Sequence, residues 1–421
     1  MARCGLSARA LRKARRVPRQ CQLCAGAVLL ARLGSAKPCG MIARLDPFHA
    51  ISISALAQRL AAQGRSVIRM EFGQPSTGAP AAALAAARTM LDGEDLGYWE
   101  SPALLKRLAR YMVETTGVAV APEQIVLTCG ASPALVIALS LRFGPGARVA
   151  LARPGYVAYR NTLRALFIEP VELPCGPDVG YQITAAALAA LDPAPDGVII
   201  ASPANPTGTV IAPAEMAAIA EVCRARGIHI VSDEIYQGIT YDAPALSMLA
   251  FESDALVVNS FSKYFSMPGW RLGWVVVPPA LIEAARAQMG NLFLTPPSLS
   301  QHAGLVALDC RDELDGHIRT YARNRDLLLA ALPGMGLARI APPDGAFYVY
   351  ADVGHLTDDS MAFCTRLLED TGVATAPGID FDPVDGHRFM RFSFAVSTPL
   401  VEEAITRMTP WFQAQPVRSG G

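Results

Sequence analysis

Lys263 is the residue of this sequence whose type and setting most clearly suggest covalent chemistry. It lies in the segment NSFSKYFSMPGWRLGW, residues 259–274, among five aromatic residues and eight positions before Arg271. Apolar surroundings and a nearby cation lower the pKa of a lysine, so that its amine is more often neutral and nucleophilic. A solvated surface lysine is the commoner case for a lysine taken alone. The segment favours a lysine that forms a Schiff base with a carbonyl group.

Two further segments place polar side chains directly after apolar runs. Asp233 ends the run IHIVSD, and Tyr236 follows three residues later. A carboxylate at the end of a buried strand is costly unless it is paired, and a protonated ring nitrogen would pair with it. Asn205, in SPANPTG, could donate a hydrogen bond from its amide to a ligand oxygen. The alternatives are a capping aspartate with a core tyrosine, and an ordinary Asn-Pro turn.

An anion site is indicated where GASPAL, residues 130–135, follows the run QIVLTC. Ser132 followed by Pro133 is typical of the first turn of a helix, whose free N–H groups can hold a phosphate. An ordinary helix start is the alternative. Ser260 and Arg271 add a hydroxyl and a guanidinium group close to the candidate lysine. This combination is typical of a site for pyridoxal phosphate (PLP).

The elements that must position these groups begin at about residue 125. Short β-rich runs alternate there with Ala/Leu-rich segments, which is typical of a mostly parallel sheet covered by helices on both faces. Ligands of such sheets bind beyond the carboxyl ends of the strands, which is where the polar groups lie. The expected strands are QIVLTC, RVALAR, EPVELP, GVIIAS, IHIVSD, ALVVNS and GWVVVP.

After about residue 300 the pattern changes. A long helical segment precedes two strand-like runs, GAFYVYADV and RFMRFSFAV, and a final helix is expected from about Leu400. This order of elements predicts a second, smaller α+β domain.

The motifs SPANPTG, VSDEIY and SFSKYFSMPGWRLGW, in this order, resemble those of the class I/II aminotransferases, which have fold type I among the PLP enzymes. The resemblance covers about residues 45–410. It implies a large α/β domain with a mostly parallel seven-stranded sheet covered by helices, and a smaller α+β domain. The expected parts are an arm that joins the small domain (41–75), a large PLP-binding domain (76–298) and a small C-terminal domain (299–415).

Residues 1–40 differ in composition from the rest of the chain. They contain nine Lys or Arg residues, no acidic residue and four of the nine cysteines. We expect a basic extension that is disordered or absent from the mature protein. A targeting segment and translated upstream sequence are the open alternatives.

The resemblance implies roles for individual residues. Lys263 would carry PLP as a Schiff base and move the proton of the substrate α-carbon, while Asp233 would pair with the pyridinium nitrogen. Tyr236 would bind the phenolic oxygen of the cofactor. Tyr98 would reach the phosphate of the cofactor in the partner subunit, in a homodimer with shared active sites. The further implied cofactor contacts are Gly130, Ala131, Ser132, Tyr156, Asn205, Ser260 and Arg271.

The resemblance also implies that Arg391, Gly73 and Asn205 bind the substrate. Arg391 would hold the α-carboxylate with both ends of its guanidinium group; a surface arginine on an edge strand is the alternative. Family members that act on dicarboxylates use a second arginine before the small domain. The corresponding segment, NLFLTPPSLSQHAG, has none and offers Phe293 between two leucines. Neutral or apolar amino acids are therefore the expected donors.

The main prediction is a PLP-dependent aminotransferase that exchanges an amino group between an amino acid and a 2-oxo acid by a ping-pong mechanism. A PLP-dependent lyase that performs β-elimination or C–S cleavage would use the same lysine and cofactor, and it stays open. A transcription regulator with an aminotransferase-like domain would need a DNA-binding domain ahead of it, for which forty residues are too few.

The composition restricts the partners. The 37 basic and 37 acidic residues balance, which gives no indication of nucleic acid binding. No run of 18 apolar residues predicts a membrane-spanning helix, and no pattern predicts a metal site. The scattered cysteines beyond residue 40 suit a reducing compartment such as the cytoplasm.

Overall fold

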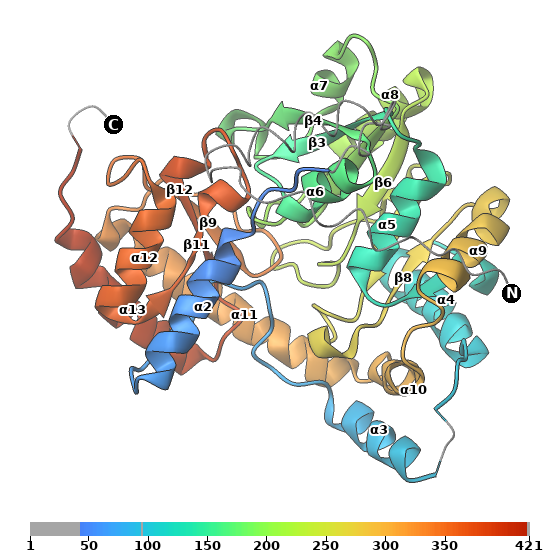
Figure 1. Cartoon of the computed structure of the whole chain (residues 1–421), viewed down its shortest axis with the longest axis horizontal. Coiled ribbons are helices and arrows are strands. Elements are labelled where there is room, and N and C mark those ends of the chain that lie inside the picture. Colours follow the sequence, from blue (N-terminus) through green and yellow to red (C-terminus); the bar gives the residue numbers. More distant parts are fainter. Residues whose placement is uncertain (1–42, 94–95, 419–421) are drawn as a thin grey trace, which may run out of the picture. The chain divides into compact units, whose positions relative to one another are not determined.

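The seven expected strands all form, and they lie in one sheet (Figure 1). The computed structural model describes residues 43–93 and 96–418 of the chain. The strands are β2 (Ile125–Thr128), β3 (Arg148–Arg153), β4 (Glu169–Pro174), β5 (Gly197–Ala201), β6 (His229–Asp233), β7 (Leu256–Ser260) and β8 (Gly273–Val276). Their order across the sheet is β2-β8-β7-β6-β5-β3-β4.

This sheet is mostly parallel, as predicted. β3 pairs in parallel with β4 and β5, and β6 and β7 continue the parallel arrangement. Among these seven strands, β8 alone runs against its neighbours, because it pairs antiparallel with both β7 and β2. The carboxyl ends of β2, β5, β6 and β7 and the amino end of β8 therefore meet at one edge of the sheet, which is where a ligand is expected.

Helices cover both faces of the seven-stranded sheet. Alternate residues of a strand point to opposite faces. In β5, Ile199 belongs to one buried apolar cluster, whereas Val198 and Ile200 belong to another. The first cluster includes side chains of α5 (Ala131–Arg142), α6 (Val157–Ala165) and α9 (Ile282–Leu292). The second includes side chains of α7 (Ala185–Ala190) and α8 (Pro213–Arg226).

Two smaller sheets are built from segments before and after this sheet in the chain. Their strands are β1 (Ile68–Arg69), β9 (Tyr348–Asp352), β10 (Val373–Ala374), β11 (Ala376–Pro377) and β12 (Phe389–Ser393). β11, β12 and β9 form an antiparallel sheet in that order, and β1 pairs in parallel with β10. The two strand-like runs expected after residue 300 thus form β9 and β12.

The remaining helices are α2 (His49–Ala62), α3 (Ala81–Gly93), α4 (Pro102–Thr116), α10 (Ser298–Ala307), α11 (Arg311–Ala331), α12 (Ser360–Thr371) and α13 (Thr398–Gln413). Of these, α2, α11, α12 and α13 lie beside the two smaller sheets, whereas α3, α4 and α10 lie apart from them, with α10 in contact with the other two (Figure 1). The expected last helix is α13, and it begins two residues before Leu400.

The expected domain boundaries remain predictions. The boundary at residues 298–299 falls in the first turn of α10. Buried apolar side chains from both sides of it, such as Leu104 and Phe347, belong to one apolar cluster. The prediction for residues 1–40 lies outside the described residues. Within residues 43–93 and 96–418, no helix is both long and apolar enough to cross a membrane.

Candidate active site

The polar groups expected at the strand ends line one cavity of about 300 Å³. This volume is within the range of sites for small molecules. The predicted site residues that line it are Gly73, Ala131, Ser132, Tyr156, Asn205, Asp233, Tyr236, Lys263, Arg271 and Arg391. Residues that the sequence analysis did not single out also line it, among them Phe48, Phe72, Tyr159, Ser262 and Tyr348.

Lys263 lies three residues beyond the end of β7, in the cavity. Burial, followed by the positive charge of Arg391, lowers the pKa of Lys263 to about 8. The carboxylate of Asp233 acts in the opposite direction. The Nζ atom of Lys263 donates a hydrogen bond to the carbonyl oxygen of Gly73. A lysine with this pKa is partly unprotonated near neutral pH, so its amine can act as a nucleophile and as a base.

Asp233 is the last residue of β6 and is almost fully buried. The hydroxyl of Tyr159 donates to its Oδ2 atom at 2.6 Å, and the backbone N–H of Ile235 donates to its Oδ1 atom at 3.0 Å. Burial raises the pKa of Asp233, while these two hydrogen bonds and the charge of Lys263 act to lower it. The carboxylate is thus held in a fixed orientation in the wall of the cavity.

Tyr159 was not predicted, although the sequence contains a signal for it. Tyr156 and Tyr159 are three residues apart at the start of α6, so they lie on one face of this helix. Their rings are 5.5 Å apart and nearly perpendicular. Both line the cavity. Tyr156 is the residue predicted to stack on the cofactor ring, and Tyr159 is bound to Asp233.

The start of α5 and Arg271 lie close together where the sequence predicts an anion site. α5 begins at Ala131, so the N–H groups of its first turn have no partner within the helix. Gly130 precedes it with a φ of 102°, and a Cβ atom there would lie 2.3 Å from Nη2 of Arg271. Only glycine allows this approach. Arg271 is fixed by hydrogen bonds to the carbonyl oxygens of Cys129 and Pro268, at 3.0 and 2.9 Å.

Ser260 lies behind the cavity wall rather than in it. Its side chain is buried, and its Oγ atom donates to the carbonyl oxygen of Leu272 at 3.0 Å. The same Oγ lies 2.7 Å from Oγ of Ser262, which does line the cavity. The structure therefore brings the hydroxyl of Ser262 to the predicted phosphate site, with Ser260 supporting it.

Arg391 enters the cavity from β12. It is 2% exposed, and its Nη1 and Nη2 atoms donate to Oδ1 of Asn205 at 2.7 Å and to the carbonyl oxygen of Glu71 at 2.6 Å. Its Nε atom is buried and has no hydrogen-bond partner among the described residues. Since Oδ1 of Asn205 accepts from Arg391, the amide nitrogen of Asn205 is left to donate, and the predicted hydrogen bond to a ligand oxygen stays a prediction.

Tyr348 connects several of the predicted residues. Its hydroxyl lies 2.6 Å from that of Tyr236, and the guanidinium carbon of Arg391 lies 4.4 Å from the centroid of its ring. A Cβ atom at position 73 would lie 1.8 Å from the Tyr348 hydroxyl, so Gly73 is the residue that this position accepts. Nothing in the sequence alone links Tyr348 to Gly73, because the contact depends on the tertiary fold.

Tyr98 and the segment around Phe293 also lie outside this cavity or away from its lining. Tyr98 is 83% exposed and lies outside it, and its predicted role concerns a partner subunit. Leu292 and Leu294 are more than half exposed, and Phe293 packs against the core of the large sheet. In the described part of the chain, no group of three or more His, Cys, Asp or Glu side chains could hold a metal ion.

The fold is that of a known class of enzymes. Residues 65–408 match the family described as aminotransferase class I and II, and the chain belongs to this family. It is 46% identical to the valine–pyruvate aminotransferase of Mycobacterium tuberculosis, over 89% of this chain and 98% of that protein.

Solved structures agree with this assignment. An aminotransferase from Mycobacterium tuberculosis superposes with a TM-score of 0.86 at 45% identity, over 88% of this chain and 98% of that chain. The Thermus thermophilus aspartate aminotransferase with maleate superposes with a TM-score of 0.81 at 30% identity, over 87% of this chain and 97% of that chain.

These comparisons confirm the predicted family, the fold type I architecture and the class of reaction. The protein is an enzyme, an aminotransferase that exchanges an amino group between an amino acid and a 2-oxo acid. Nothing in the comparisons favours the lyase that the sequence analysis left open.

Proposed function

We propose that this aminotransferase uses PLP, held through Lys263, to transfer the amino group of a neutral, apolar amino acid to a 2-oxo acid. The observation that carries the proposal is the set of cations in the cavity. Among its lining residues, the cations are Lys263, Arg271 and Arg391. Lys263 is required for the covalent bond, Arg271 lies at the anion site of α5, and Arg391 faces the α-carboxylate. None is left for a second carboxylate.

The residues present fit PLP. The close approach of Arg271 to Gly130 and the free N–H groups of α5 suit its phosphate. The buried carboxylate of Asp233 suits a protonated ring nitrogen, since burial without a cationic partner is costly. Tyr156 would cover the ring face and Tyr236 would donate to the phenolic oxygen. When bound, PLP supplies an electron-withdrawing ring that stabilises negative charge at the substrate α-carbon.

The protein's own groups then have separate tasks. Arg391 binds the α-carboxylate and so orients the α-carbon toward the ring face. The neutral amine of Lys263 would take the proton of the substrate α-carbon on Nζ, hold it there, and return it during the exchange of the amino group. Asp233, oriented by Tyr159, keeps the ring nitrogen protonated. The product oxo acid leaves before the acceptor binds, which is a ping-pong sequence.

The preference for an apolar donor has two supports. Phe48, Phe72 and Ile235 line the cavity, and burying a charged side chain against them without a partner would cost several kcal/mol. The relative with 46% identity is named for valine and pyruvate. We therefore propose valine-like donors, and pyruvate as an acceptor.

A comparison of donors tests this proposal. We expect kcat/KM to be higher for valine, leucine and methionine than for aspartate by about tenfold or more, with pyruvate as acceptor. Steady-state rates with each donor at saturating acceptor provide the values. If aspartate exceeds the apolar donors by about tenfold, which corresponds to about 1.4 kcal/mol of transition-state binding, the proposal is wrong.

We also propose a homodimer with shared active sites, in the cytoplasm. Exposed apolar side chains occur in two segments, as Tyr98 with Leu96 and as Leu292 with Leu294, and a second copy of the chain would cover them. The five cysteines among the described residues are free, which suits a reducing compartment.

Mixed dimers test whether the sites are shared. Lys263→Ala and Tyr98→Phe chains, each severely impaired alone, are expected to regain about a quarter of wild-type activity after random mixing, since half of the dimers then hold one intact site. Two different affinity tags isolate the mixed dimers, which should have about half of wild-type activity. Isolated mixed dimers as inactive as the parents would contradict the shared site.

A further inference from the structure

Phe48 lies where the N-terminal arm meets the cavity. The centroid of its ring is 6.4 Å from that of Tyr156 and 6.5 Å from that of Phe72, and both pairs meet edge to face. Phe72 follows Glu71, whose carbonyl oxygen accepts a hydrogen bond from Arg391. Phe48 therefore bounds the cavity on the side where Arg391 lies, which is the proposed substrate side.

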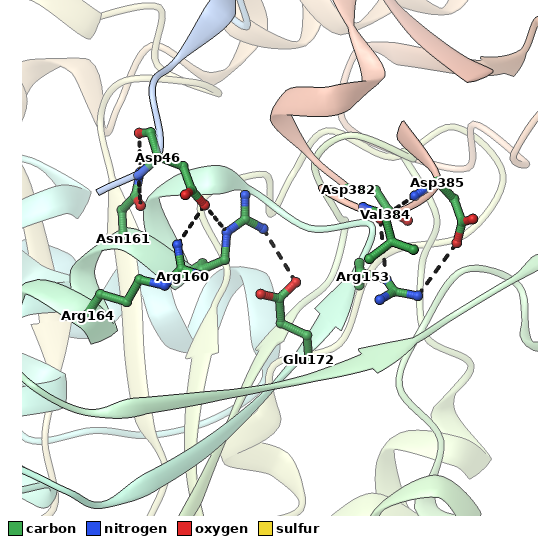
Figure 2. A network of polar contacts seen from close by, with 9 residues as sticks. All are labelled: Asp46, Arg153, Arg160, Asn161, Arg164, Glu172, Asp382, Val384 and Asp385. Carbon is green, nitrogen blue, oxygen red and sulfur yellow. Dashed lines mark hydrogen bonds and ion pairs between the residues drawn. The ribbon is translucent and has the colours of Figure 1, made fainter. Parts of the chain in front are cut away.

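Asp46, two residues before Phe48, is bound to α6 by four contacts (Figure 2). Its Oδ2 atom accepts hydrogen bonds from Nε of Arg160 and from Nη1 of Arg164, both at 2.7 Å. Its backbone N–H donates to Oδ1 of Asn161 at 2.9 Å, and its carbonyl oxygen accepts from Nδ2 of Asn161 at 3.0 Å. Contacts to both the side chain and the main chain fix the orientation of the arm as well as its position.

We call these four contacts of Asp46 with α6 the clamp. The α6 side of the clamp is itself anchored. The Arg160 side chain is 4% exposed, and its Nη1 atom lies 3.5 Å from Glu172 on β4. Burial acts to raise the pKa of Asp46, but the hydrogen bonds and charges of Arg160 and Arg164 lower it overall. Asp46 is therefore ionised near neutral pH, and the clamp is a charged one.

A second anchor follows Phe48. The backbone N–H groups of His49 and Ala50 donate to the two carboxylate oxygens of Asp380, at 2.6 and 2.8 Å. Asp380 is fully buried, and a carboxylate at the start of a helix such as α2 is favourable. Phe48 is thus held from both sides. Asp46, before it in the arm, is bound to α6, and the residues after it are bound by Asp380 at the start of α2.

We propose that Asp46 is a positioning residue for the substrate, and that its clamp holds Phe48 as the wall against which an apolar donor side chain packs. The inference rests on the proposed function, because it takes the donor side chain to be apolar. Tyr159 of α6 and Tyr156, the residue directly before this helix, both line the cavity at the proposed cofactor site. The clamp therefore sets the position of Phe48 relative to the helix that orients the reacting groups.

A double-mutant cycle tests this inference. Asp46→Ala and Phe48→Ala are each expected to raise KM for valine by about fivefold or more, with kcat changed less than about twofold. Both should lower the ratio of kcat/KM for valine to that for alanine, because alanine does not reach the wall. The double variant should have the same ratio as Phe48→Ala, since Asp46 acts through Phe48.

Asp385→Asn is the matched control. Asp385 lies 3.5 Å from Arg153 of β3 and belongs to the neighbouring network in Figure 2, but it does not contact the arm. This variant should keep the valine-to-alanine ratio of the wild type. Asp46→Asn retains the size of the side chain and replaces Asp46→Ala if the latter unfolds. Asp46→Glu keeps the charge and should restore part of the valine-to-alanine ratio.

Several outcomes would overturn the inference. An unchanged ratio in folded Asp46→Ala or Asp46→Asn would do so, as would a double variant in which the two effects multiply independently. A wild-type enzyme that prefers aspartate would overturn the proposed function and this inference together. Apolar preference in the wild type with no change in the variants would overturn this inference alone.

Discussion

Replacing Lys263 by alanine is expected to lower the rate of amino-group transfer by about 10³-fold or more, since the variant loses both the nucleophile and the general base. The purified wild type should have a visible absorption band that borohydride abolishes, and the variant should lack a band that responds in this way. The lowered pKa of Lys263, about 8, is the reason that its amine is available near neutral pH.

Lys106→Ala is the control for this experiment. Lys106 is exposed on α4, outside the cavity, so its removal should leave both the rate and the absorption band unchanged. Melting temperatures of both variants close to that of the wild type would show that neither change disrupts the fold. A Lys263→Ala enzyme with wild-type turnover would refute the assignment of the catalytic lysine.

Asp233→Asn is expected to have the second largest effect, a fall in kcat of about 10²-fold or more. The amide keeps the shape of the side chain but cannot offset a positive charge on the ring nitrogen of the cofactor. The buried position at the end of β6 makes the loss larger than on the surface, because buried charges are weakly screened. Single-turnover rates with valine would measure the loss in the first half of the reaction.

Tyr159→Phe gives a graded comparison for Asp233. It removes the 2.6 Å hydrogen bond to Oδ2 but leaves the carboxylate in place. A hydrogen bond to a charged group contributes about 1.5–3 kcal/mol, so an intermediate loss of about 10- to 100-fold is expected. Asp233→Asn within about threefold of the wild type would contradict the proposed ring-nitrogen contact.

The strands and the site at their ends could be predicted because both depend on local patterns. Most of the strands are short apolar runs, and Asp233, Asn205 and Lys263 lie at the end of such a run or within four residues beyond it. Parallel strands bring their carboxyl ends to one edge, so residues far apart in the chain meet there without any knowledge of specific contacts. The reversed direction of β8 could not be predicted, since an apolar run has the same appearance in either direction.

Other parts of the site depend on contacts that no local pattern encodes. Tyr348, on β9, meets Tyr236 and Gly73 only in the folded chain, because the three residues lie far apart in the sequence. Arg391 is recognisable by resemblance, but its partner Asn205 could not be assigned from spacing. Phe48 lines the cavity, and the arm that carries it is bound to α6 by Asp46. This placement depends on the path of the arm in the folded chain.

The most direct test of the account is to locate the bound cofactor. The sequence contains four lysines, Lys13, Lys37, Lys106 and Lys263. Borohydride reduction of the purified enzyme, followed by proteolysis and mass spectrometry, should find the mass of reduced PLP on the peptide that contains Lys263 and on no other lysine. Addition of valine before reduction should prevent this labelling, because the donor displaces Lys263. Cofactor attached to a different lysine, or no attached cofactor, would contradict the central claim.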